Sequence, residues 1–324
     1  MLKTRLTEMF GVETPIVMGG MTGVGYGELV AAVANAGALG FIVAHMFPSA
    51  DELKAEIEKT RKLTDKPFGV NLTLLPSLNP IPYDDYRRAI IESGIKIVET
   101  AGRSPIEHLP DFKAAGVKVI HKCTSARHAV TAARLGVDVI SIDGFECAGH
   151  PGEDDVPGLV LIPAAADQLK IPMIASGGFG DGRGLAAALA LGADGINMGT
   201  RFCATVEAPI HQNVKQFIVD NDERGTNIIF KKFRNTARVA KNSVSDKVVE
   251  ISALPDAKFE DIHSYVAGAK GRAALETGDI DAGLIWAGQV QGLIRDIPTC
   301  KDLIERIVSD AEGIIRGRLA NMLR

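Results

Sequence analysis

His150 is the residue whose surroundings most clearly suggest chemistry. It lies within FECAGHPGEDDVPG (residues 145–158), where glycine-containing turns and prolines stiffen the chain. An imidazole on a stiff loop suits a general base or an anchor for an anion. We therefore predict that His150 is catalytic. The remaining histidines are expected to be structural: His45, His108, His121, His128, His211 and His263.

Two glycine-rich segments suit a phosphate group. SGGFGDGRG (residues 176–184) and MGTRF (residues 198–202) each follow a short apolar stretch. Glycines let backbone N–H groups approach a ligand closely. In parallel α/β barrels, the loops after strands 7 and 8 and a nearby helix start hold phosphate. We predict a phosphate site here, although the glycines could instead serve only tight turns.

Polar side chains also end or interrupt apolar stretches. Lys122 ends the apolar run VKVIHK, where it could stabilise a ligand that becomes anionic or pair internally with Glu99 or Asp143. Asn71 and Thr73 alternate along one stretch and so point the same way. They suit hydrogen bonds to the edge of a planar ring, or simply to their neighbours.

The elements that must position these residues alternate along the first two-thirds of the chain. Apolar, β-branched stretches alternate with helical patterns such as GELVAAVANAG and SARHAVTAARLG, which predicts parallel strands covered on both faces. Eight such units favour a (β/α)8 TIM barrel. The strands are expected at residues 15–20, 39–44, 68–75, 95–101, 117–123, 137–143, 172–177 and 195–202.

The alternation stops after the eighth strand. Residues 206–280 read as helices with charged loops, and we predict a small helical lid or substrate domain there. Residues 1–205 and 281–324 would then form the barrel and its C-terminal helices.

Composition narrows the classes of protein. The net charge of −4 argues against a nucleic-acid partner. We expect no membrane span and no signal peptide, because no long apolar run occurs and charges lie near the N-terminus. Four dispersed cysteines indicate a reduced, cytoplasmic setting, with Cys147 as packing rather than nucleophile. The acidic trio Glu153, Asp154 and Asp155 lacks metal-ligand spacing, so no metal is expected.

Taken in order, several motifs resemble one family over nearly the whole chain. They are GGMTGVG, GVNLTLLP, ETAG, HKCTSARHA, SIDGFECAGHPGEDD, ASGGFGDGRG and NMGTRF. This set resembles the nitronate monooxygenases, formerly called 2-nitropropane dioxygenases. The histidine stands in AGHPGEDD rather than in a GGHRG-like setting, which is similar to a bacterial branch of NADH:quinone reductases.

The resemblance implies FMN as cofactor and assigns residues to it. His150 matches the family's active-site histidine, and Pro76 falls in a loop near the substrate entrance. The phosphate would be held by Gly177, Gly178, Gly199 and Thr200. The ring would lie among Gly20, Met21, Thr22, Thr73, Lys122, Asp143 and Ala148, with Asn71 on the same strand as Thr73.

Three enzymatic functions remain open. In the first, hydride from NADH, or alternatively NADPH, enters at flavin N5 and the electrons leave to a quinone. In the second, O2 oxidises a small nitronate that His150 stabilises. The third is an enoyl-acyl-carrier reductase, for which the basic run 231–241 could serve as a docking face. A non-catalytic flavin-binding or phosphate-binding barrel would leave Lys122 and His150 without a role. The oligomeric state stays open, with a homodimer as one option.

Overall fold

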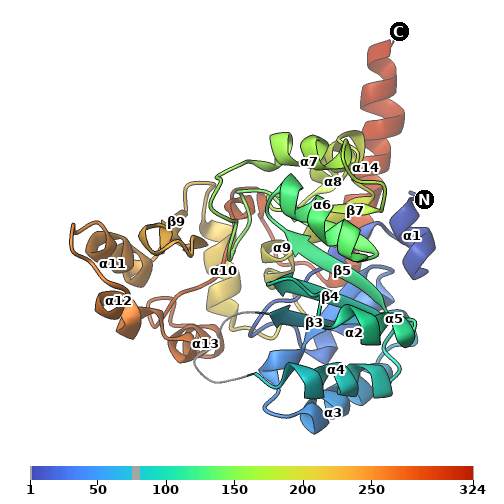
Figure 1. Cartoon of the computed structure of the whole chain (residues 1–324). Coiled ribbons are helices and arrows are strands. Elements are labelled where there is room, and N and C mark those ends of the chain that lie inside the picture. Colours follow the sequence, from blue (N-terminus) through green and yellow to red (C-terminus); the bar gives the residue numbers. More distant parts are fainter. Residues whose placement is uncertain (1, 75–80, 324) are drawn as a thin grey trace.

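Eight parallel strands close into a barrel in the computed structural model, which describes residues 2–74 and 81–323 (Figure 1). Strand β1 completes the ring, because Val17 pairs with Leu39 of β2 and with Asn197 of β8. The predicted (β/α)8 barrel is confirmed. Its strands are β1 Ile16–Met18, β2 Leu39–Val43, β3 Gly69–Leu74, β4 Ile97–Gly102, β5 Lys118–Cys123, β6 Val139–Asp143, β7 Met173–Ser176 and β8 Gly195–Met198.

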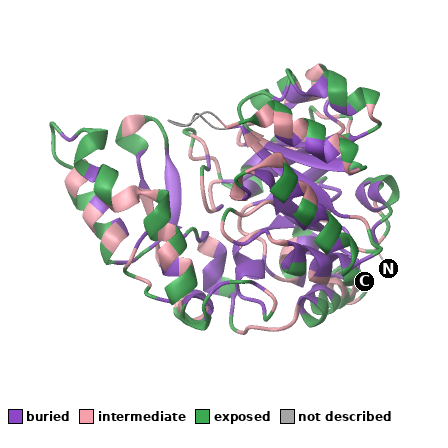
Figure 2. Cartoon of the chain, turned by 90° about the horizontal axis from the view of Figure 1, so that it is seen from below, coloured by how far each residue is buried: buried purple, intermediate pink, exposed green. Residues whose placement is uncertain are grey.

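One helix follows each of the first seven strands and covers the outside of the barrel. In α3, Ser49 caps the first turn by accepting a hydrogen bond from Glu52 N–H, and Leu53 and Ile57 are buried against the barrel. Figure 2 shows the result as buried strands within a ring of helices whose outer faces are exposed. The helices are α2 Gly27–Asn35, α3 Ala50–Arg61, α4 Tyr83–Glu92, α5 Leu109–Ala114, α6 Ala126–Leu135, α7 Gly158–Ala166 and α8 Gly182–Ala190.

The eighth strand is shorter than predicted. We expected residues 195–202, but β8 ends at Met198 and the short helix α9 begins at Thr200 and ends at Cys203. Gly199 separates the two elements, so the MGTRF segment turns at the mouth of the barrel instead of extending the strand.

The barrel interior is filled in two layers of different character. Helix α1 (Arg5–Phe10) closes the N-terminal end, where Leu6 and Phe10 join an apolar cluster with inward side chains such as Phe41. Nearer the carboxyl ends of the strands the interior is polar, with Glu99 fully buried. The apolar layer stabilises the barrel, and the polar layer lies beneath the site.

The segment after β8 is not wholly helical, which corrects the prediction. Strands β9 (Thr226–Ile229) and β10 (Ala237–Ala240) pair antiparallel, with the 3-10 turn η2 (Lys231–Phe233) between them. Strands of four residues are too short to show a clear alternation of polar and apolar residues. Around them lie α10 Gln212–Asp220, α11 Ser243–Ser252, α12 Phe259–Val266 and α13 Gly268–Thr277.

These later elements form a smaller unit beside the barrel mouth (Figure 1). Seven residues make its own apolar cluster: Ile229, Phe230, Ala237, Val239, Val248, Ile262 and Leu284. Helix α10 instead packs Val214 and Ile218 into the barrel's cluster, although we expected it in the small domain. We therefore propose a small unit that runs from β9 to about Leu284.

The chain returns to the barrel through η3 (Gln289–Leu293) and the helix α14 (Cys300–Gly313). Helical turns continue through Leu323, and Figure 1 shows this end extending away from the barrel. One further short turn, η1 (Ala44–Met46), follows β2. In the described part of the chain, no helix is long and apolar enough to cross a membrane.

Candidate active site

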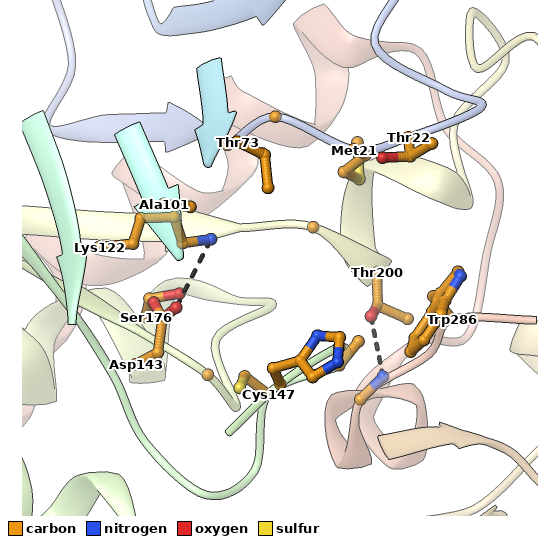
Figure 3. Close-up of a pocket in the computed structure, with 18 of the residues that line it drawn as sticks. Met21, Thr22, Thr73, Ala101, Lys122, Asp143, Cys147, Ser176, Thr200 and Trp286 are labelled. Carbon is orange, nitrogen blue, oxygen red and sulfur yellow. Dashed lines mark hydrogen bonds and ion pairs between the residues drawn. The ribbon is translucent and has the colours of Figure 1, made fainter. Parts of the chain in front are cut away.

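A cavity of about 930 Å³ opens at the carboxyl ends of the barrel strands. Every predicted site residue lines it except two. Asn71 lies beneath it, and Pro76 lies outside the described residues. The predicted residues that line it are Gly20, Met21, Thr22, Thr73, Lys122, Asp143, Ala148, His150, Gly177, Gly178, Gly199 and Thr200. Figure 3 labels six of them, Met21, Thr22, Thr73, Lys122, Asp143 and Thr200.

The floor of the cavity is held by the buried carboxylate of Glu99. One of its oxygens, Oε2, accepts hydrogen bonds from Gly20 N–H (2.8 Å) and Asn71 Nδ2 (2.7 Å), and Oε1 accepts one from Asn197 Nδ2 (3.2 Å). A Cβ atom on Gly20 would lie 2.3 Å from Asn71 Cγ, so this position requires glycine. Asn71 therefore supports the floor from below and does not face the cavity.

Two threonine hydroxyls border the cavity on the β1 and β3 side. Thr73 donates its hydrogen bond to Asn71 Oδ1 (2.7 Å), which leaves the hydroxyl oxygen free to accept from a ligand. The Thr22 hydroxyl lies 3.0 Å from His45 Nε2. Burial lowers the pKa of His45, so this imidazole is neutral at pH 7. Both hydroxyls are thus held by partners outside the cavity.

A cation and an anion face each other between β5 and β6. Lys122 Nζ lies 3.6 Å from Asp143 Oδ2, as the dashed line in Figure 3 marks. Burial alone would lower the pKa of Lys122, but the carboxylates Asp143 and Glu99 outweigh it and raise the pKa. Lys122 is therefore a permanent cation. The other oxygen, Asp143 Oδ1, is buried without a hydrogen-bond partner among the described residues.

The glycine-rich loops form a backbone cradle after β7 and β8. Gly177 and Gly178 adopt left-handed φ angles of 87° and 85°, and a Cβ on Gly177 would lie 2.8 Å from the Gly144 carbonyl. Across from them, the Thr200 hydroxyl accepts from Gly288 N–H at 3.0 Å and keeps its own proton to donate. This arrangement can admit a phosphate close to the backbone.

Helix α8 itself does not supply the free N–H groups that we expected. Asp181 caps it, accepting from the N–H groups of Arg183 and Gly184 at 2.9 and 3.1 Å. Of the run 176–184, only Ser176, Gly177, Gly178 and Phe179 line the cavity. A phosphate would therefore bind to the loops and not to the start of α8.

His150 stands at the cavity beside Trp286, whose ring centroid is 6.0 Å away at an interplanar angle of 33°. The His150 side chain is exposed to the open cavity, but the protein around it still desolvates the ring and lowers the pKa of His150, and the carboxylate of Glu153 offsets this in part. His150 is therefore neutral at pH 7. A neutral imidazole can transfer a proton or hold a polar substrate atom, but it offers little charge to an anion.

The sequence did not reveal Trp286 or Asn197 as parts of the site, and it indicated Glu99 only as a possible internal partner of Lys122. Trp286 is the only tryptophan of the chain, but it lies far along the sequence from any predicted strand end. Glu99 lies on β4 within the apolar stretch IVETAG, and a charge there is a signal that could have been followed further.

The cysteines and two residues of the acidic trio, Glu153 and Asp155, take structural roles. All four cysteines are free and buried, and burial raises the pKa of Cys147, so it is no thiolate nucleophile. Glu153 binds Thr236 and Asp155 pairs with Lys231. Within the described residues, no cluster of three or more His, Cys, Asp or Glu could hold a metal ion.

Comparison with known proteins identifies the family. The family model described as nitronate monooxygenase matches residues 3–310. The chain belongs to the nitronate monooxygenase family. Members of this family are flavin-dependent oxidoreductases, so this protein is an enzyme of that class.

Proteins similar to this chain have names that specify different activities. A probable nitronate monooxygenase of Staphylococcus saprophyticus is 31% identical, covering 97% of this chain and 99% of that protein. A Rhodococcus jostii protein named (3aS,4S,5R,7aS)-5-hydroxy-7a-methyl-1-oxo-octahydro-1H-indene-4-carboxyl-CoA dehydrogenase is 36% identical, with 96% of both chains covered. Among solved structures, FabK from Thermotoga maritima is 34% identical, with a TM-score of 0.91 over 99% of this chain and 100% of that chain.

The cavity of this nitronate monooxygenase family member fits a flavin phosphate cofactor. The glycine cradle lies at one part of the cavity, and the fixed cation Lys122 with the unfilled acceptor Asp143 Oδ1 lies at another. A cofactor with a phosphate, several hydroxyl donors and a ring that becomes anionic matches these groups.

Proposed function

We propose that this protein is an FMN-dependent NAD(P)H:quinone reductase. The observation that carries the proposal is the neutral His150 beside Trp286 in a cavity roomy enough for a cofactor and an organic ring together. Cavities of roughly 300–1,000 Å³ accommodate drug-sized ligands. A neutral, planar substrate suits such a wall better than a small anion does.

In this proposal FMN is bound by the cavity residues that the resemblance assigned to it. Gly177, Gly178, Gly199 and Thr200 would hold its phosphate, and Thr22, Thr73 and Lys122 would border its ring. FMN supplies the two-electron redox chemistry that protein side chains lack. Lys122 contributes a positive charge in a buried setting, where it favours negative charge nearby.

The protein's own part in quinone reduction is orientation and proton supply. Trp286 offers an aromatic face for a planar ring. A quinone oxygen needs a proton when it is reduced. The neutral His150 can relay one, because one ring nitrogen passes its N–H proton to the quinone oxygen while the other nitrogen takes up a proton from solvent.

Anaerobic stopped-flow absorbance tests the proposal. We expect NADH or NADPH to bleach the bound flavin rapidly, and 1,4-benzoquinone then to restore its colour. Failure of both nicotinamides to bleach the flavin would overturn the proposal. Comparing the two nicotinamides at equal concentration also assigns the electron donor.

Oxidation of small nitronates by O2 is the second candidate. The name of the family and of the Staphylococcus saprophyticus relative support it. Bleaching by propyl-2-nitronate without any nicotinamide would favour this function. An acyl-CoA thioester belongs in the same panel of substrates, because the name of the Rhodococcus jostii relative specifies one.

The basic run 231–241 gives less support to an acyl-carrier docking face. Lys231 pairs with Asp155, and Lys232 donates to the carbonyls of Leu254 and Pro255. Arg238 is buried. Most of the positively charged side chains in this run are therefore paired or buried within the chain. A homodimer stays a prediction, to be tested by sedimentation.

A further inference from the structure

The loop that carries His150 is held by the small unit, not only by the barrel. We propose that Glu153 and Arg238 are positioning residues for His150, so that strand β10 sets where the imidazole stands in the cavity. This inference rests on the proposed role of His150 in catalysis.

Backbone hydrogen bonds join the loop to β10 immediately before His150. Gly149 N–H donates to the Arg238 carbonyl at 3.0 Å, and Arg238 N–H donates to the Gly149 carbonyl at 2.7 Å. This is an antiparallel bridge, so the loop extends the β9–β10 sheet by one short edge. The residue next to His150 is thereby fixed to the small unit.

The side chain of Arg238 makes a second attachment to the same loop. Its guanidinium donates to the Phe145 carbonyl (3.0 and 3.3 Å) and to the Thr226 hydroxyl (2.7 Å), and lies 4.7 Å from the Phe145 ring centroid. Arg238 is only 3% exposed. A planar guanidinium makes these contacts together, and a lysine ammonium cannot reproduce them.

Glu153 makes the attachment on the other side of His150. Its Oε1 accepts from Thr236 N–H at 2.8 Å, and its Oε2 accepts from the Thr236 hydroxyl at 2.5 Å. Thr236 is 1% exposed and lies next to β10. His150 is therefore bracketed by attachments at Gly149 and Glu153.

One residue of the loop has a strained backbone. Gly149 and Gly152 adopt φ angles of 78° and 85° without strain, whereas Asp155, a non-glycine residue, has a φ of 53°. The conformation at Asp155 is held by surrounding contacts, among them its ion pair with Lys231. The final segment adds support, since Gln289 N–H donates to the Glu146 carbonyl at 3.0 Å.

The charges around His150 allow the influence of Glu153 to be measured through the pKa of His150. Glu153, on the same loop, is the charged group that raises the pKa of His150 against the effect of desolvation. From β10, Arg238 directs its guanidinium to Phe145, and Lys231 in η2 is paired with Asp155. The segment around Trp286 brings an uncharged ring.

The test compares Glu153→Gln with Asp154→Asn in the FMN-loaded enzyme. Asp154 is the adjacent acidic residue, exposed and outside the cavity wall, so its variant controls for lost charge. Histidine ring resonances followed by NMR give the pKa of His150, assigned by its disappearance in His150→Asn. We expect Glu153→Gln to lower that pKa and to reduce quinone turnover at least ten-fold while FMN stays bound. We expect Asp154→Asn to match the wild type.

Arg238→Lys provides a second variant that keeps the charge. We expect a comparable loss of kcat with FMN content unchanged. An unchanged His150 pKa and turnover in Glu153→Gln would overturn the inference, even if Arg238→Lys does not fold. If Glu153→Gln shifts the pKa but His150→Asn keeps full turnover, the proposed catalytic role fails while the positioning stands.

Discussion

At the scale of single residues, His150 gives the sharpest test of what the cavity does. Replacing it in His150→Asn removes the proton-transferring ring and leaves the glycine cradle and Lys122 intact. We expect turnover to fall by about 10²–10⁴-fold, as for loss of a general acid or base. Steady-state rates measure the loss, and visible absorbance shows that FMN remains bound.

His128→Asn is the matched control, because His128 also lines the cavity but comes from α6. It should retain close to wild-type turnover. Loss of FMN in His150→Asn would instead identify His150 as a cofactor contact.

Lys122 carries the second residue-scale prediction. Lys122→Met removes the cation that faces Asp143, so negative charge on the reduced cofactor loses its stabilisation. We expect the midpoint potential of the bound flavin to become more negative by on the order of 30 mV or more, since 30 mV corresponds to about 1.4 kcal/mol for two electrons. A dye-coupled redox titration measures this shift.

Lys118→Met lies on the same strand and serves as control. Lys118 is exposed and pairs with Asp138 at 2.7 Å, at the other end of β5. The two variants should differ in potential. Equal potentials would show that Lys122 acts only as the internal partner of Asp143.

Site residues could be predicted where a polar residue or a glycine stands at the end of an apolar strand. Lys122, Asp143 and Gly177 each end or follow a recognisable apolar stretch, and the barrel brings them to one mouth. Asn71 lies on the predicted strand and on the same side as Thr73, whose hydroxyl donates to its Oδ1, but it does not line the cavity. How close Asn71 comes to the cavity depends on the packing of Gly20 against it, and the alternation along the strand does not report that packing.

At the scale of elements, the loop after β7 decides whether the cofactor can enter. In Gly178→Val, a β-branched residue would occupy a φ of 85° and place its side chain beside Glu146 in the cradle. We expect apoprotein, seen as loss of visible absorbance relative to the protein peak. The backbone strain alone costs about 1–3 kcal/mol.

Gly116→Val separates strain from cofactor exclusion. Gly116 has a φ of 67° in the turn between α5 and β5, and open space surrounds its missing Cβ. This variant should be destabilised but yellow. If both variants lose FMN equally, the cradle assignment is wrong.

Among the elements, the eight barrel strands were predictable because apolar stretches alternate regularly with helical patterns, even though β1, β7 and β8 are no longer than β9 and β10. β9 and β10 were not, since TNII and ARVA carry no pattern that distinguishes them from the charged loops around them. Their pairing arises from tertiary contacts, with Val239 in the core of the small unit and Arg238 beneath Phe145. Because the attachment of the His150 loop depends on the same tertiary contacts, the sequence alone does not predict it.

At the scale of the whole molecule, a buried and neutral histidine at the site makes the stability of the fold depend on pH. His121 lies on β5, is 6% exposed and has its Nδ1 2.8 Å from the Thr100 hydroxyl. Burial lowers the pKa of His121 to about 4, with a smaller contribution from His128. The unfolded chain has a histidine pKa of about 6.5. The unfolded state therefore binds the proton first as the pH falls.

The contribution of neutral His121 to the free energy of unfolding is therefore complete above about pH 6.5 and is lost progressively as the pH falls to about 4. The difference of about 2.5 pKa units corresponds to about 3 kcal/mol, of which about 2 kcal/mol is lost by about pH 5. Urea unfolding at about pH 7 and about pH 5, at equal FMN concentration, measures the loss. His121→Gln should lose less stability on acidification by that amount, whereas the exposed His263→Gln should behave as the wild type. An equal acid loss in His121→Gln and the wild type would show that His121 does not control this transition.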